Sequence, residues 1–238
     1  QILMYLLVGV VFIHNTERRY YASASVSVLQ HVEKKKINSY SLQYMITNGL
    51  WAIFMLNDTF LLGRFCTPDV IADYRVAYTI PGSISIISSA IGIYVAPYFV
   101  QHEDDKPWVQ KNFKRVYGMT ALVVGSLCII IALLSKPIIW LLYGKDYLNV
   151  VGVMRVLLLG AFFNCGLRFT TANILAAMGK VKYNMAVSIV GMITQLIINL
   201  KIIPLYGAVG VATTSCIVYG IMAACLLGAF IKQYYLKE

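Results

Sequence analysis

Ionisable side chains inside long apolar stretches are the residues of this chain most suited to chemistry. Asp58, Arg155 and Arg168 all fall in such stretches. A charged side chain near the centre of a bilayer costs about 2.5–3.5 kcal/mol on insertion scales, so it usually faces a cavity or pairs with a partner. The short side chain of Asp58 cannot easily reach the membrane surface. We therefore expect Asp58 to face a cavity or to pair with an arginine of a neighbouring span.

The strongest cationic candidate is Arg168, near the centre of the apolar stretch 150–177. Asn164 lies four residues earlier and shares its helical face, so the two side chains together suit an anionic group. The alternatives for Arg168 are hydrogen bonds to carbonyls of a broken helix and an ion pair with Asp58. Arg155 lies near the end of the same stretch, where a long side chain reaches the lipid headgroups. Arg155 and Arg64 are secondary candidates.

A polar stripe follows one face of the stretch 184–203. Its members recur at steps of 4, 3, 4 and 4 residues, which keeps them on one side of a helix: Asn184, Ser188, Gly191, Gln195 and Asn199. Such a stripe is either a hydrogen-bonded seam between helices or the wall of a wet pathway, and its four polar members are further candidates for binding a substrate. A second stripe, of small residues, is expected to pack closely against another helix: Gly82, Ser85, Ser89 and Gly92.

Membrane-spanning helices are the elements that must position these side chains. Hydrophobic residues make up 59% of the 238 residues and charged residues 13%, against about 25% charged in ordinary soluble domains. A helical span needs roughly 20 apolar residues. Six stretches approach or exceed that length: 45–63, 78–100, 116–135, 150–177, 184–203 and 208–231. The sequence therefore predicts an all-α polytopic transmembrane bundle of six complete spans.

The net charge of +10 is distributed unevenly between the two sides of this bundle. Thirteen Lys and Arg residues fall in the connections 14–45, 101–115, 178–183 and 232–238, and five fall in the opposite connections. By the positive-inside rule the first set, including the C-terminus, is expected in the cytoplasm. The basic charge thus indicates orientation and not nucleic-acid binding.

Catalytic and metal-binding patterns are missing from the predicted spans. The three histidines (His14, His31 and His102) lie in predicted connections, the five cysteines show no CxxC spacing, and no paired acids occur within a span. A polar loop explains the run His102–Asp105 more simply than a metal site does. We expect no enzyme activity, no metal and no cofactor, because polar groups without catalytic chemistry indicate a conduit.

The beginning of the chain differs from the six spans. The apolar run from Ile2 to Ile13 has about 12 residues, fewer than a span needs. We expect residues 1–13 to be the end of a truncated transmembrane helix and 14–44 a basic cytoplasmic linker. The six-helix lobe then covers 45–231, and 232–238 forms a cytoplasmic tail.

Four segments carry a resemblance to a known family. The segment NDTFLLGRFCTPDVIADYRVAYTI (57–80) resembles the opening of the second half of bacterial polysaccharide flippases of the multidrug/oligosaccharidyl-lipid/polysaccharide (MOP) superfamily, the proteins of O-antigen, capsule and exopolysaccharide synthesis. IIWLLYGKDY (138–147), ILAAMGKVKYN (174–184) and IPLYGAVGVATT (203–214) are similar to later signatures of the same family. The resemblance extends from about residue 40 to the end of the chain.

The resemblance implies a two-lobed transporter of twelve spans, of which this chain is the second lobe. It implies a multi-pass protein of the bacterial cytoplasmic membrane that moves an undecaprenyl-pyrophosphate-linked oligosaccharide by alternating access. Arg168 would then bind the pyrophosphate, Asn164, Gln195 and Asn199 sugar hydroxyls, and Asp58 a coupling proton or Na⁺. The expected partners are the bilayer, the missing N-terminal lobe and polysaccharide polymerase machinery.

Several other functions remain open from the sequence. A cation-coupled multidrug exporter of the same superfamily would favour acidic and aromatic cavity residues over arginines. A lipid II flippase is a close relative that the sequence separates poorly. From other classes, a membrane-bound glycan-processing enzyme and a non-transporting assembly partner are the alternatives.

Overall fold

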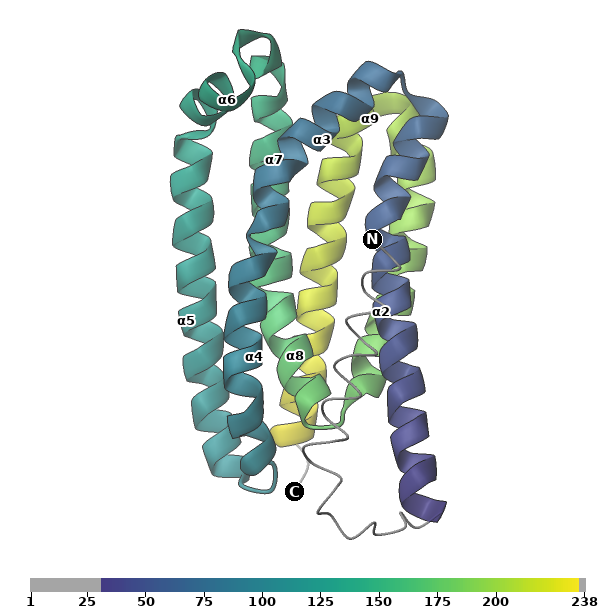
Figure 1. Cartoon of the computed structure of the whole chain (residues 1–238), viewed down its shortest axis with the longest axis vertical. Helices are drawn as coiled ribbons and strands as arrows, with labels where there is room; N and C mark the ends of the chain where they lie inside the picture. Colours follow the sequence, from purple (N-terminus) through teal and green to yellow (C-terminus); the bar gives the residue numbers. More distant parts are fainter. Residues whose placement is uncertain (1–30, 236–238) are drawn as a thin grey trace, which may run out of the picture. The chain divides into compact units, whose positions relative to one another are not determined.

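Helices with the length and apolar character of membrane spans make up most of residues 31–235, the part of the chain that the computed structural model describes (Figure 1). There are five such stretches among these residues: Ile37–Phe65, Pro68–Gln101, Lys106–Leu133, Lys145–Ala177 and Val181–Tyr234. The expectations for residues 1–30 and 236–238 lie outside the described residues. Residues from Tyr40 onward form one compact unit, and the packing below concerns that unit.

The helical elements follow one another with short connections. In chain order they are α2 (His31–Phe65), α3 (Pro68–Ser83), α4 (Ser85–Gln101), α5 (Lys106–Leu133), α6 (Ser135–Tyr143), the 3₁₀ helix η2 (Lys145–Val150), α7 (Val151–Ala161), the π-helical turn η3 (Phe162–Arg168), α8 (Phe169–Ala177) and α9 (Val181–Tyr234). No strand occurs among the described residues. The all-α polytopic bundle predicted from the sequence is thus confirmed.

The last stretch is two helices joined at Gly207. This residue has φ 53° and ψ −130°, a backbone conformation that side chains with a Cβ rarely adopt. The chain reverses there, so that the arms 181–206 and 208–234 run side by side (Figure 1). The Tyr183 hydroxyl lies 3.4 Å from Gln233 Oε1 across the two arms. The five apolar stretches therefore contain six helical passes.

The structure differs from the predicted boundaries in two places. Residues 31–44, expected in a linker, are helical and run without a break into the first pass. The connection 136–149 contains most of α6 and η2. Hydropathy detects only the apolar part of a helix, and the segment 31–48 is polar but lacks glycine and proline, so nothing in it ends the helix.

Two apolar clusters lie toward opposite ends of the unit. One contains Leu62 of α2 and Leu158 of α7, and the other contains Phe113 of α5, Leu175 of α8 and Phe230 of α9. The segment between Leu158 and Leu175 includes η3, where Asn164 and Arg168 are buried. These clusters hold the helices on either side of a polar middle region.

Candidate functional site

Asp58 is the centre of a buried hydrogen-bond cluster. Its Oδ1 accepts hydrogen bonds from Gln195 Nε2 at 2.7 Å and Asn199 Nδ2 at 3.0 Å. Its Oδ2 accepts from the hydroxyls of Tyr74 and Ser215, each at 3.1 Å. A carboxylate offers about four lone-pair sites, so these four neutral donors, from α3 and both arms of α9, account for all of them.

The ion pair considered for Asp58 is not formed within residues 31–235. The ion pair that the described residues do contain joins Lys180 to Glu103, at 3.8 Å. Oriented N–H and O–H dipoles stabilise the buried carboxylate without a counter-charge. Of the two alternatives expected for Asp58, the pairing with an arginine, Arg168 included, is not formed among the described residues.

The polar stripe of α9 is a packed seam between helices. All five of its members are buried. Gln195 and Asn199 donate hydrogen bonds to Asp58. Asn184 Nδ2 donates a hydrogen bond to the Ala172 carbonyl at 2.7 Å. Gly191 packs against the Met222 side chain. A Cβ on Gly191 would come within 2.5 Å of the Met222 sulfur. Of the two interpretations left open by the sequence, the structure favours the seam over the wet pathway; Ser188 lies in the same seam.

Arg168 is buried in a different surrounding. Its Nη1 donates to Asn164 Oδ1 at 3.0 Å, and its guanidinium carbon lies 4.5 Å from the centre of the Trp51 ring. The side chain is 6% exposed, and its Nε has no hydrogen-bond partner among the described residues. The π-helical turn that holds both residues interrupts the regular helix, a feature found often at functional sites. Arg168 therefore keeps its charge and most of its donors for a further partner.

A cavity of about 270 Å³ lies beside these two groups. Asp58, Asn164 and Ser215 contribute polar groups to its wall. Three of the four small residues of 78–100 also line it: Gly82, Ser85 and Ser89. The two glycines are closely packed, because a Cβ on Gly82 would lie 2.8 Å from the Tyr78 ring and one on Gly92 would lie 2.4 Å from the Asn173 amide nitrogen. Arg168 is not part of the wall, but its two partners Asn164 and Trp51 are.

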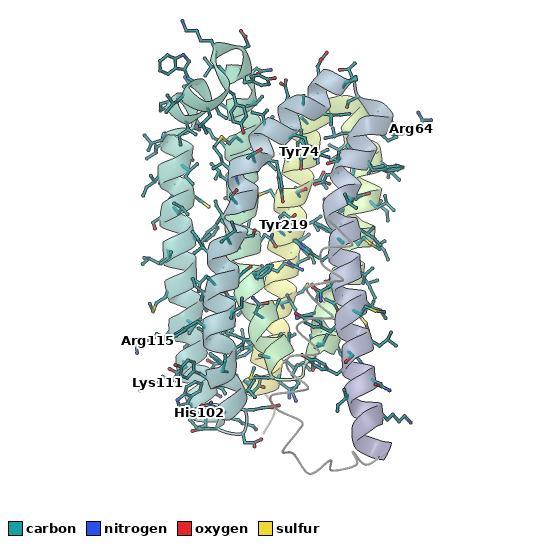
Figure 2. The ribbon with its side chains drawn as sticks, in the orientation of Figure 1. Arg64, Tyr74, His102, Lys111, Arg115 and Tyr219 are labelled. Atoms are coloured by element: carbon teal, nitrogen blue, oxygen red, sulfur yellow. The ribbon has the colours of Figure 1, made fainter. Side chains whose placement is uncertain are left out.

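Aromatic residues of the wall were missed by the sequence analysis. Trp51, Tyr74 and Tyr219 all line the cavity, and Figure 2 shows Tyr74 and Tyr219 within the bundle. The Trp51 and Tyr219 ring centres are 6.2 Å apart. The sequence spacing could have predicted this position for both residues. Trp51 precedes Asp58 by seven residues and Tyr219 follows Ser215 by four, so each aromatic residue shares a helical face with a polar residue of the site.

The secondary candidates lie away from the cavity. Arg155 Nε donates to the Ala132 carbonyl at 3.2 Å and to Ser135 Oγ at 3.0 Å, so it holds the corner between α5 and α6. Its contact with the headgroups stays a prediction. Arg64 is exposed at the end of α2 and points outward in Figure 2. His102 stacks on Trp108 at 4.1 Å. Within residues 31–235 there is no group of three or more His, Cys, Asp or Glu side chains that could hold a metal ion.

The sequence and the fold are both similar to those of known membrane proteins. Residues 1–152 match the family model described as polysaccharide biosynthesis protein. A relative from Methanocaldococcus jannaschii, named an uncharacterized membrane protein, is 26% identical over 193 residues, which cover 79% of this chain and 38% of the relative.

Solved structures of transporters share the fold. One, the outward-facing conformation of a multidrug resistance MATE family transporter of the MOP superfamily, has a TM-score of 0.69 at 18% identity over 85% of this chain. A MOP superfamily transporter from Pyrococcus furiosus, described as having a binding pocket of reverse polarity, has a TM-score of 0.68 at 18% identity over 86%. The chain covers 45% and 46% of these two structures, less than half of their length.

Proposed function

Because the chain belongs to the polysaccharide biosynthesis protein family, we propose that the complete protein moves a lipid-linked oligosaccharide across the membrane by alternating access. The observation that carries this proposal is a polar cavity inside a membrane bundle, beside a buried arginine that has no acidic partner among the described residues. A glycan and a phosphate-rich head cannot cross hydrocarbon unaided, because each unpaired polar group there costs several kcal/mol. A cavity of this kind replaces the water that they lose.

In this proposal Arg168 binds the anionic pyrophosphate. One of its five N–H donors is used by Asn164, and its charge has no acidic partner among the described residues. Charge-assisted hydrogen bonds from arginine to phosphate are among the strongest in proteins. Asn164 and the serines Ser85 and Ser89 would meet sugar hydroxyls. The sequence also predicted that Gln195 and Asn199 bind sugar hydroxyls, but their amides donate hydrogen bonds to Asp58.

We also propose that Asp58 carries the coupling proton or Na⁺. Gln195 Oε1 and Asn199 Oδ1 are buried beside the carboxylate and have no donor among the described residues. Carboxylate and amide oxygens are the ligands that hard cations prefer. To bind there, a cation must displace one or more of the four donors from Asp58. It would then satisfy the amide oxygens and neutralise the carboxylate, so its binding is coupled to a rearrangement of this cluster.

A second candidate function, export of cationic drugs, is favoured by the same wall. Asp58, Trp51 and Tyr219 line the cavity, and a ligand cation binds to acidic groups and to aromatic faces. The family match favours the glycan, and the acidic and aromatic wall favours the drug.

Replacing Arg168 by Ala in the complete protein tests the glycan proposal. We expect at least a tenfold lower rate of lipid-linked oligosaccharide translocation in proteoliposomes, since a charge-assisted hydrogen bond contributes about 1.5–3 kcal/mol. Arg155→Ala, which removes an arginine from the same pass outside the cavity, is the control and should translocate normally. Normal glycan translocation by Arg168→Ala at equal expression would contradict the proposal. Export of a cationic dye by the wild type, with no glycan translocation, would support the second candidate.

A further inference from the structure

A groove of about 760 Å³ opens on the surface between α4 and α5. None of its lining residues contributes to the wall of the cavity beside Asp58. Both helices belong to apolar stretches with the length of membrane spans. The groove is bordered by exposed side chains, of which Tyr94 is 70% and Met119 60% exposed. In a bilayer this groove would therefore open toward lipid.

Most of the groove is apolar and elongated. Ile91 and Val95 of α4 face Val116 and Val123 of α5 across it. The lining residues as a whole extend over more than two turns of each helix, along the direction in which lipid chains lie. The wall is therefore suited to an acyl chain.

One end of the groove is polar and positively charged. Trp108, Asn112 and Arg115 line it at the beginning of α5. Arg115 is exposed and forms no hydrogen bond or ion pair with a described residue. Its side chain points away from the bundle in Figure 2, near the turn that carries His102. A guanidinium without a partner is thus available at the end of an apolar groove.

Arg115 forms no ion pair with the acidic residues of the preceding turn. Two of the three acidic residues in the preceding turn are engaged: Glu103 with Lys180 at 3.8 Å, and Asp105 with the Trp108 backbone N–H at 3.0 Å. Lys114 lies over the Tyr235 ring at 5.4 Å, on another side of α5. The guanidinium of Arg115 is therefore free to bind an anion.

We propose that this groove binds an anionic membrane phospholipid, with its phosphate on Arg115 and Asn112 and one acyl chain along the α4–α5 wall. Arginine binds phosphate through charge-assisted hydrogen bonds. Tryptophan and tyrosine favour the level of the lipid headgroups. Tyr98 and Trp108 lie at the same end of the groove as Arg115.

A comparable groove between α5 and α7 lacks this complementarity. It has a volume of about 620 Å³ and also contains an arginine, Arg155. The Arg155 side chain is held by the Ala132 carbonyl and Ser135 Oγ. Of the two grooves, the one with Arg115 has the unpaired cation, so anion selectivity is expected there.

Native mass spectrometry of the complete protein tests the proposal. The protein is titrated with phosphatidylglycerol and with phosphatidylcholine of the same acyl chains. Arg115→Gln should weaken the first phosphatidylglycerol binding step about fivefold, because a basic residue at the surface contributes about that factor. Phosphatidylcholine binding should weaken less, because its cationic choline lies beside the phosphate and opposes Arg115. Lys111→Gln removes the same charge from the same helix outside the groove, and should change neither.

A second variant tests the apolar wall independently. Ala90→Phe narrows the groove, leaves Arg115 in place and should weaken binding of both lipids. Equal loss in Lys111→Gln and Arg115→Gln would overturn the site, as would equal affinity of the wild type for the two lipids. A second protein copy that excludes lipid from the groove, detected as a dimer lost in Ala90→Phe, would also overturn it. Melting temperatures of the variants report that each is folded.

Discussion

Asp58 shows how a buried charge can be held without a counter-charge. Four neutral donors from three parts of the chain meet at one carboxylate. Each hydrogen bond to a charged group contributes about 1.5–3 kcal/mol. The same cluster joins α2, α3 and both arms of α9, so the carboxylate is a structural junction as well as a candidate ion site.

Substitutions at Asp58 should therefore separate stability from charge. Asp58→Ala leaves four buried donors without an acceptor, each at a cost of about 1–3 kcal/mol, and we expect a large fall in melting temperature. Asp58→Asn keeps one acceptor oxygen, and the hydroxyls of Tyr74 and Ser215 can rotate to accept from its amide. This variant should stay folded while transport loses its dependence on the ion gradient.

The matched control for these variants is Asp73→Asn. Asp73 binds Asn149 at 2.8 Å and lies outside the cavity wall, so its substitution should leave both melting and coupling unchanged. Equal melting temperatures for Asp58→Ala and Asp58→Asn would contradict the proposal that Asp58 is a structural junction. Unchanged gradient dependence in Asp58→Asn would remove the coupling role.

Two short irregular elements decide where the polar residues of the bundle lie. The π-helical turn Phe162–Arg168 holds Asn164 and Arg168 at the cavity side of the α7–α8 pass. Gly207 reverses the chain between the arms of α9 and so brings Ser215 beside Gln195, at 3.1 Å. Both elements are a few residues long, yet the site depends on them.

The reversal at Gly207 gives a testable stability effect. Gly207→Ala forces a Cβ into φ 53° and ψ −130°, which costs about 1–3 kcal/mol, and should lower the melting temperature of the purified protein. Gly118→Ala is the control, because its added Cβ meets nothing within 4 Å and alanine favours a helix by about 1 kcal/mol over glycine. An unchanged melting temperature for Gly207→Ala would show that the reversal tolerates a side chain.

The sequence predicted the elements better than their junctions. The apolar stretch 150–177 was assigned to one span, and the i−4 spacing of Asn164 and Arg168 indicated that the two side chains meet, as they do. The π-helical turn itself gave no hydropathy signal, because hydropathy averages over a span. The polar part of α2 was missed for the same reason, since hydropathy marks apolar length and not helix ends.

Across the whole bundle, the connections alternate between two ends (Figure 1). The turns 66–67, 134–150 and 207 lie at one end, and 102–105 and 178–180 lie at the other, where Lys180 pairs with Glu103. The count of Lys and Arg residues in the connections assumed this same alternation. The positive-inside rule then predicts that the end with 102–105 and 178–180 is cytoplasmic.

Cysteine labelling in cells measures that orientation. In a complete protein whose native cysteines are replaced, Lys145→Cys should react with a membrane-impermeant maleimide added outside. Lys182→Cys should react only after permeabilisation, because it lies at the predicted cytoplasmic end. Reversed labelling of the pair would invert the predicted topology.

The sequence by itself determined that the chain is a helical membrane bundle and predicted that Asp58, Asn164, Arg168 and the polar stripe of 184–203 lie inside it. Apolar length and helical spacing are local properties, so they can be read along the chain. Which of these groups meet was decided by the tertiary structure. Asp58 is 137 residues from Gln195 and 157 from Ser215, and four donors from other helices left no acceptor site for Arg168. The aromatic part of the cavity wall likewise arises only where Trp51 and Tyr219 pack together, since close packing between two helices cannot be predicted from the sequence of either one alone.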